Sequence, residues 1–297
     1  MGINYRTYEP NQGLEEFQAK LYNQANNRNV TAKEIQERYE REKIDPKTVR
    51  YAFTKDGKPL AYVQARDYPA VGETHIGYPW IMPDCPLEVK NKLYDDLLAY
   101  VKTRKTDLKI KMNVQADRVD FAKQRGFKEE QKFIRYKIKF DTLKNYNPSD
   151  SKYVLRKAAE DELEAIKNGY IEAYNLTNPA EIERLTNYTK DRFKENHLIV
   201  ATYNNAIIGG TAPFIEEGEP NPENIGALRL RFLFTIKGHE ISIPELFKKS
   251  MELSHEANWD NHFILITFSD ENPDELSNLD KISSEKTIMG IKLALEL

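Results

Sequence analysis

The sequence has few of the features that mark specialised classes of protein. It contains a single cysteine, Cys85, so an intrachain disulfide is excluded and a reducing compartment is indicated. No apolar run approaches the roughly 20 residues that cross a bilayer. The N-terminal residues MGINYRTYEP are polar from the start, unlike a signal peptide. These absences lead us to expect a cytoplasmic protein.

Metal and nucleotide motifs are also missing. The five histidines are scattered without metal-ligand spacing relative to Cys85, so we predict no metal site. There is no GxxxxGK[ST] loop, no GxGxxG motif and no zinc finger. A net charge of −3 gives no general attraction to nucleic acids or anionic membranes. Residues 101–140 are a local exception, with 13 Lys and Arg against five Asp and Glu. This basic stretch is either a solvated surface or a phosphate contact.

What the sequence does have is a long-range repeat. Residues 48–67 read TVRYAFTKDGKPLAYVQARD, and residues 196–216 read NHLIVATYNNAIIGGTAPFIE. Each predicts a strand, a tight polar turn and a second strand. Each follows two helical segments and precedes a strand, a long amphipathic helix and a further strand. A spacing of about 148–150 residues is too long for a solenoid and indicates two copies of one domain.

Local signals agree with this order of elements. Asp56-Gly57 lies between two alternating segments and predicts a hairpin turn. Thr31, followed three residues later by Glu34, is typical of a capping box at the start of a helix.

The predicted fold class is α/β, with two domains in tandem. Each domain is expected to be a twisted mixed sheet flanked by helices. The polar segment LKNYNPSDS predicts a linker at residues 143–151, between domains at 1–142 and 152–297. Closing strands are predicted at Phe133–Phe140 for the first copy and Thr287–Leu295 for the second.

A few fragments resemble one known superfamily. Phe121–Phe127, FAKQRGF, resembles the aromatic-Tyr-Glu-Lys-Leu-Gly-Phe helix-to-strand signature of GNAT acyltransferases. In the second copy, Asn272–Leu276 resembles the start of the same helix, and Thr287–Met289 resembles its closing strand. Together with the order of elements over nearly the whole chain, these fragments identify a GNAT-like domain that occurs twice.

The resemblance implies that acetyl-CoA lies between two splayed parallel strands, with its pyrophosphate at the start of the long helix. A helix N-terminus offers unpaired N–H groups and the positive end of its dipole to such an anion. In the first copy this place reads PDCPLEVK (residues 83–90), which has two prolines, two carboxylates and no glycine, so no CoA site is expected there. In the second copy a glycine remains. The predicted cofactor-binding residues are therefore Phe234, Ile236, Lys237, Gly238, His239, Glu240, Ile241, Ser242 and Asn272.

The catalytic residues that the family uses are less evident. A Tyr protonates the departing thiolate in many members. By position this Tyr corresponds to Ala122 and Leu279, and neither can donate a proton. Glu216 and Glu217 are the predicted general bases of the second copy, with Glu73 as the counterpart in the first. An amine that is already deprotonated needs little beyond positioning to attack a bound thioester.

Arg229 and Arg231 alternate with apolar residues, so both are predicted to project from one face of a strand. They are candidates for binding a carboxylate or phosphate of the substrate. The alternative is that they pair with Glu216 and Glu217.

These observations predict an acyl-CoA-dependent N-acyltransferase that acetylates an amine of a small molecule or protein, with its site in the C-terminal copy and the N-terminal copy as a structural partner. Such a chain is expected to act as a monomeric pseudo-dimer or as a homodimer, without membrane or nucleic-acid partners. One alternative is a catalytically inactive GNAT-fold binding or scaffold protein. Another is an aminoacyl-tRNA-dependent transferase of the Fem type, which only the basic stretch supports.

Overall fold

The structure is a computed structural model of the chain, and two compact units make it up. Unit 1 comprises Met1–Lys132 and Gly290–Leu297, and unit 2 comprises Phe133–Met289. The residues that the structure describes are 2–10, 12–26, 29–104, 107–146, 152–177, 179–214, 225–271 and 273–295.

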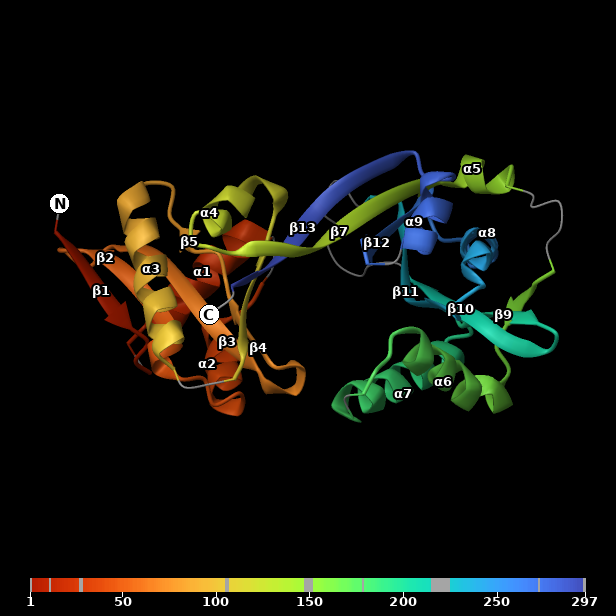
Figure 1. Cartoon of the computed structure of the whole chain (residues 1–297), viewed down its shortest axis with the longest axis horizontal. Coiled ribbons are helices and arrows are strands. Elements are labelled where there is room, and N and C mark those ends of the chain that lie inside the picture. Colours follow the sequence, from red (N-terminus) through yellow and green to blue (C-terminus); the bar gives the residue numbers. More distant parts are fainter. Residues whose placement is uncertain are drawn as a thin grey trace. The chain divides into compact units, whose positions relative to one another are not determined.

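Unit 1 contains one mixed sheet with the strand order β1-β2-β3-β4-β6-β13, and a short strand β5 that pairs with β3 (Figure 1). Its elements are β1 (Ile3–Thr7), α1 (Leu14–Asn26), α2 (Ala32–Arg41), β2 (Val49–Thr54), β3 (Pro59–Tyr68), β4 (Glu73–Ile76), β5 (Trp80–Ile81), α3 (Leu87–Thr103), β6 (Lys109–Val114), α4 (Val119–Lys123) and the start of β7 (Lys128–Lys139).

Unit 2 repeats this plan with the strand order β7-β12-β11-β10-β9-β8. Its elements are the rest of β7, α5 (Phe140–Lys144), β8 (Val154–Lys157), α6 (Leu163–Ala173), α7 (Pro179–Lys194), β9 (Ile199–Tyr203), β10 (Ala206–Phe214), β11 (Ala227–Thr235), α8 (Ile243–Glu256), β12 (Phe263–Ser269), α9 (Pro273–Asp280) and the start of β13 (Glu285–Leu295), whose later residues belong to unit 1. In each unit a mixed set of strands is flanked by helices, which confirms the predicted fold class.

The last strand of each sheet comes from the other half of the sequence. In unit 2, Phe133–Lys139 of β7 pair antiparallel with β12. In unit 1, Ile291–Leu295 of β13 pair antiparallel with β6. The compact units therefore differ from the predicted segments 1–142 and 152–297. Both strands alternate apolar and polar residues, so the pattern of either strand suits either sheet.

The predicted linker, residues 143–151, also differs in part from the structure. The helix α5 covers its first two residues, because Phe140 and Leu143 are buried against the core of unit 2. Residues 147–151 lie outside the described residues.

Several local predictions are confirmed. The Thr31 side chain accepts the Glu34 N–H, and the Glu34 carboxylate accepts the Thr31 N–H, so the capping box is complete. Strands β2 and β3 form the predicted antiparallel hairpin, and Gly57 in its turn has a φ of 82°. A residue with positive φ favours glycine because glycine lacks a Cβ.

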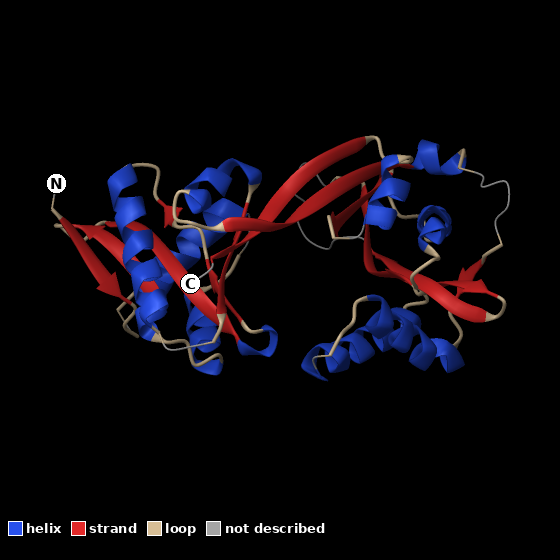
Figure 2. Cartoon of the chain, viewed as in Figure 1, coloured by secondary structure: helices blue, strands red, loops and turns tan. Residues whose placement is uncertain are grey.

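Helices cover both faces of each sheet (Figure 2). In unit 1 one buried cluster lies under α3 and contains Leu97, and the other lies under α1 and α2 and contains Phe17. In unit 2 the corresponding clusters contain Phe247 of α8 and Ile166 of α6. Burial of these apolar faces positions the central strands and the loops that follow them.

Candidate functional site

Two parallel strands at the centre of unit 2 separate along their length. Strand β11 pairs with β12 at Ala227–Arg229, opposite Phe263–Leu265. The ladder does not continue beyond Arg229 in the described residues, although β11 runs to Thr235 and β12 to Ser269. On its other side β11 stays paired with β10 as far as Thr235. Beyond Arg229, the backbone edge of β11 that faces β12 therefore makes no ladder hydrogen bonds to β12 in the described residues.

In the loop after β11, the backbone N–H of Gly238 binds the carboxylate of Glu240. Gly238 has a φ of 91°, and a Cβ added there would meet no atom within 4 Å. Its N–H donates to both carboxylate oxygens of Glu240, at 2.9 and 3.0 Å. The Gly238 N–H therefore already binds a negative group, the Glu240 carboxylate.

The donors of His239 and Ser242, close to the start of α8, are engaged within the loop. The His239 N–H donates to the Ile236 carbonyl at 3.0 Å. The Ser242 N–H and hydroxyl both donate to the His239 carbonyl, at 2.9 and 2.8 Å, and Ser242 is fully buried. Pro244, in the first turn of α8, has no N–H. The predicted role of Ser242 as a phosphate donor would require these bonds to open.

The two predicted cationic residues of the loop differ in their surroundings. Lys237 is exposed. The His239 ring lies near two tyrosine rings, with centroid distances of 5.8 Å to Tyr153 and 5.5 Å to Tyr203. The Tyr153 hydroxyl is 3.4 Å from His239 Nδ1. The imidazole is therefore part of an aromatic cluster, whereas Lys237 is open to solvent.

Phe234, a predicted cofactor-binding residue, has its side chain in the core. It is 1% exposed, and its ring packs against Gly169 and Gly210, where any added Cβ would clash with it. Only the backbone of Phe234 is available to a ligand. Ile236 is half-buried, and for Ile241 only the backbone is described.

The corresponding loop of unit 1 differs in chemistry. Asp84 forms an ion pair with Lys58, and the Cys85 N–H donates to the Met82 carbonyl at 3.0 Å. Pro86 begins α3 without a side-chain cap. Burial raises the pKa of the Cys85 thiol, so the thiol stays protonated at neutral pH and is a poor nucleophile. This loop of unit 1 therefore has no glycine that could bind an anion in the way that Gly238 does.

The positions of the family's catalytic Tyr are apolar in both units. Ala122 and Leu279 are both fully buried in hydrophobic clusters, so neither takes part in proton transfer. The predicted bases Glu216 and Glu217, and the predicted Asn272, lie outside the described residues.

Glu73, the candidate base of unit 1, is held in a polar cluster. Its carboxylate accepts a hydrogen bond from Lys292 Nζ at 2.8 Å and lies 2.7 Å from His75 Nε2. Burial alone would raise the pKa of Glu73, but the bonds from Lys292 and His75 lower it below its usual range. A carboxylate with a lowered pKa is a weak proton acceptor, which disfavours Glu73 as a general base.

The predicted substrate residue Arg229 lies beside further cations. Arg229 and Lys137 are both register partners of Leu265, so the three side chains form one row across β11, β12 and β7. Next to this row is a cavity of about 380 Å³, lined by Arg135, Lys137, Leu265, Glu285, Thr287 and Met289.

Within this cavity Lys137 lies 3.5 Å from the Glu285 carboxylate and 4.6 Å from the centre of the Phe263 ring. Our sequence reasoning did not single out Arg135 or Lys137, although both lie in the basic stretch 101–140. For Arg231 only the backbone is described, and it pairs with Ala212 of β10.

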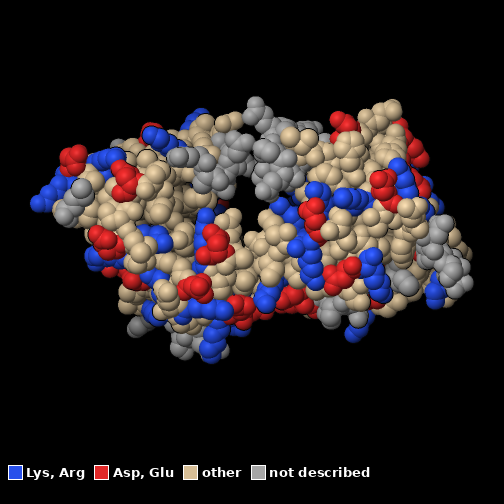
Figure 3. All heavy atoms as spheres, turned by 90° about the horizontal axis from the view of Figure 1, so that it is seen from above, with Lys and Arg blue, Asp and Glu red and all other residues tan. Residues whose placement is uncertain are grey.

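Elsewhere in the basic stretch, cations lie next to acids. Lys111 pairs with Glu130, and Lys123 pairs with Glu129 at 2.6 Å. Lys, Arg, Asp and Glu are mixed over the surface drawn in Figure 3. Such pairing favours a solvated surface over a phosphate-binding field.

The described residues hold neither a metal-binding cluster nor a helix that could span a membrane. These residues contain no group of three or more His, Cys, Asp or Glu side chains that could hold a metal ion. In the same part of the chain, no helix combines the length and apolar character that crossing a membrane requires.

Comparison with solved structures identifies the fold. A GCN5-related N-acetyltransferase from Sphaerobacter thermophilus matches 98% of this chain and 95% of its own, with a TM-score of 0.61 and 12% identity. A tandem GNAT protein from the clavulanic acid biosynthesis pathway matches 99% and 98%, at 0.58 and 11%. A GNAT-family acetyltransferase from Colwellia psychrerythraea matches 99% and 100%, at 0.57 and 10%. No protein-family model and no curated protein matches the sequence.

The chain therefore has the fold of the GNAT acetyltransferases. It carries this fold twice, as the tandem GNAT protein does, and the match extends over essentially the whole length of both chains. This confirms the resemblance that the sequence fragments suggested. At 10–12% identity the likeness defines the fold and leaves activity to be argued from the site.

Proposed function

We propose that this protein is an acyl-CoA-dependent N-acyltransferase whose active site lies in unit 2, at the splayed strands β11 and β12. The observation that carries the proposal is the end of the parallel ladder at Arg229, which leaves the β11 edge available to a ligand's amides. We take acetyl as the transferred group, because it is the simplest acyl chain. The single cysteine suits a reducing, cytoplasmic compartment.

The loop after β11 fits the pyrophosphate of such a cofactor under one condition. Gly238 offers a backbone N–H, open space around its Cβ position and a neighbouring exposed cation, Lys237. Glu240 must turn away, since its carboxylate now accepts that N–H. When bound, the cofactor supplies an acyl group activated as a thioester.

The cavity beside Arg229 is the proposed acceptor site. Arg135, Lys137 and Arg229 favour an amine substrate that also bears a carboxylate or phosphate, and the Glu285 carboxylate can accept a hydrogen bond from its neutral amine. Because Ala122 and Leu279 occupy the Tyr positions, no Tyr is present there to donate a proton. Arg135, Lys137, Arg229 and Glu285 would therefore act by orienting a neutral amine.

Binding of acetyl-CoA to the full chain tests the proposal by isothermal titration calorimetry. Gly238→Glu should weaken binding at least tenfold, because it places a negative side chain at the anion-binding N–H. Gly57→Glu is the matched control, since Gly57 also has positive φ and open space around its Cβ position. The proposal fails if wild-type protein gives no binding heat at millimolar acetyl-CoA, or if both variants bind equally.

One observation favours a second function, a catalytically inactive GNAT-fold binding protein. The donors of Gly238, His239 and Ser242 are all satisfied within the loop, and both Tyr positions are apolar. This function predicts the absence of acetyl-CoA binding in the same titration. Acetyl-CoA hydrolysis or transfer to an added amine would refute it.

A further inference from the structure

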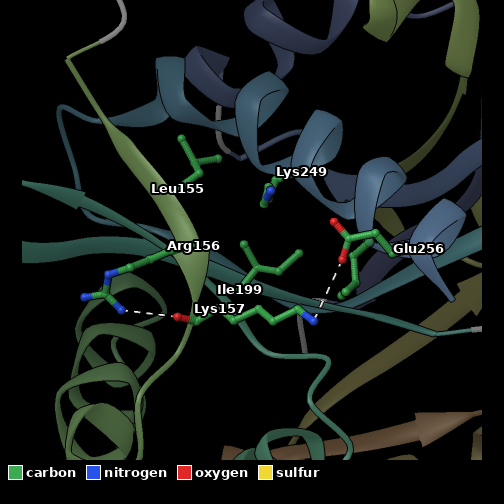
Figure 4. A pocket seen from close by; sticks show the side chains of 7 residues that line it. Leu155, Arg156, Lys157, Ile199, Lys249 and Glu256 are labelled. Carbon is green, nitrogen blue, oxygen red and sulfur yellow. Dashed lines mark hydrogen bonds and ion pairs between the residues drawn. The ribbon is translucent and has the colours of Figure 1, made fainter.

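A second cavity in unit 2 lies away from the loop just described, between the sheet edge and α8 (Figure 4). It has a volume of about 410 Å³, within the range of roughly 300–1,000 Å³ that is typical of small-molecule sites. Strands β8 and β9 form one wall and one face of α8 forms the other. The lining residues are Leu155, Arg156, Lys157, Ile199, Lys249, Leu253 and Glu256.

The wall of this cavity is aliphatic. Leu155 and Lys157 are two residues apart along β8, so both side chains point to the α8 side, and Ile199 of β9 is the register partner of Lys157 (Figure 4). Leu253 of α8 contributes from the opposite wall. Ile199 and Leu253 also belong to the buried cluster beneath α8, so the wall is fixed by core packing.

The duplication shows what the same place holds in unit 1. Tyr5 of β1 pairs with Ala52, and Leu155 of β8 pairs with Ala201. Both alanines are fully buried under the long helix, two residues before their strand ends. Leu155 therefore occupies the position of Tyr5.

The helices and second strands align in the same way. Tyr94 of α3 and Phe247 of α8 are both fully buried aromatic residues, and six residues later the helices carry Tyr100 and Leu253. Two residues before the paired alanines, the strands carry Arg50 in unit 1 and Ile199 in unit 2. Three large side chains in unit 1 thus correspond to three smaller aliphatic ones in unit 2.

In unit 1 these large side chains occupy the space between strands and helix. Lys92 Nζ lies 5.3 Å from the centre of the Tyr5 ring. The Arg50 guanidinium lies 5.3 Å from the Tyr100 ring, whose hydroxyl donates to Asp45 at 2.6 Å. The cavity of unit 2 follows from the loss of these two rings and the guanidinium.

Two lysines lie at the rim of the cavity, Lys157 and Lys249, and each has an acidic neighbour. Lys157 is 3.9 Å from the Glu256 carboxylate, beyond hydrogen-bond range, while Lys249 donates to Glu252 at 2.9 Å. The Arg156 side chain points away from the other labelled residues in Figure 4 and is bound by Glu162.

We propose that this cavity binds a small aliphatic carboxylate. Its chain would lie over Leu155, above the buried Ile199 and Leu253, and its head group would replace Glu256 and Glu252 as the partner of Lys157 and Lys249. Apolar burial of the chain and a charge-assisted bond to the head group together define this ligand class. The site is independent of the acyltransferase proposal, because none of its lining residues belongs to the loop or to the splayed strands.

Titration of the full chain with octanoate, followed by calorimetry and by methyl chemical shifts, tests the proposal. Octanoate should bind, and octanamide, which has the same chain without the charge, should bind at least several-fold more weakly. Leu253→Tyr restores the unit 1 residue and should weaken octanoate binding at least tenfold, because its ring fills the cavity.

Leu87→Tyr is the matched control, since Leu87 is exposed on α3 of unit 1 and the change should leave octanoate binding unaltered. If Leu253→Tyr fails to fold, Leu155→Tyr on the edge strand tests the same space. The proposal is overturned if octanoate does not bind, if octanamide binds equally well, or if a folded Leu253→Tyr or Leu155→Tyr protein binds octanoate as the wild type does.

Discussion

Replacing Glu240 by glutamine tests whether the protein's own carboxylate competes with a bound phosphate. Glu240 accepts the Gly238 N–H through both oxygens. Hydrogen bonds to charged groups contribute about 1.5–3 kcal/mol. Glu240 is half-exposed, and solvent screening places its bond near the lower end, at about 1.5 kcal/mol. Glutamine keeps the length of the side chain but removes its charge.

The glutamine amide oxygen can still accept the Gly238 N–H, so only the part of the bond that depends on charge is lost, about 1 kcal/mol. Since about 1.4 kcal/mol corresponds to a tenfold change in affinity, Glu240→Gln should lower the Kd for acetyl-CoA about fivefold in calorimetry. Removing the repulsion between Glu240 and the pyrophosphate acts in the same direction. The control is Glu164→Gln, which makes the same change of net charge on an exposed residue of α6.

Two results would refute this reasoning. An affinity that is unchanged or weaker in Glu240→Gln would mean that the carboxylate does not compete for the site. An equal gain in Glu164→Gln would mean that net charge alone, and no contact at Gly238, controls binding.

Three further predictions concern stability and reactivity. Leu293→Ala should reduce the hydrogen-exchange protection of β6 in unit 1, and Ile138→Ala should reduce that of β12 in unit 2. We expect a loss of about 2–5 kcal/mol in each case, because each side chain is fully buried in the core of that unit. The opposite pattern would contradict the strand assignment. Cys85 should react slowly with iodoacetamide at pH 7, because burial raises its thiol pKa, and a rate equal to that of a free thiol would contradict this. The pKa of Glu73 is lowered in the folded state, so its contribution to the unfolding free energy is present above the unfolded value of about 4.3 and is lost as the pH falls through the folded value. Chemical denaturation should show a shallower loss with acid in Glu73→Gln, and an identical pH profile would refute it.

The order of elements was predictable because each domain repeats strong local signals. The hairpin at Gly57 and the capping box at Thr31 depend on residues close in sequence, and both are present in the structure. The pairing of the closing strands was not predictable in this way. Ile138 and Leu293 lie in strands with the same alternating pattern, and only contacts far apart in sequence decide which sheet each strand joins.

The candidate site was predicted in outline and missed in detail. Gly238 identified the loop in the sequence, because close approach of a backbone to a phosphate favours glycine, and its positive φ in the structure favours glycine as well. The contact from Glu240 to Gly238 depends on how the loop turns, which sequence alone does not specify. Similarly, Lys137 lies in one row with Arg229 only because both are register partners of Leu265, and the sequence alone does not specify that pairing.

A crystal structure of the full chain grown with acetyl-CoA tests the central claim most directly. We predict density for the cofactor between β11 and β12, its pyrophosphate on the Gly238 N–H and the Glu240 carboxylate turned away. Density that leaves Glu240 on Gly238 with no cofactor beside β11, or a cofactor bound only in unit 1, would contradict the claim.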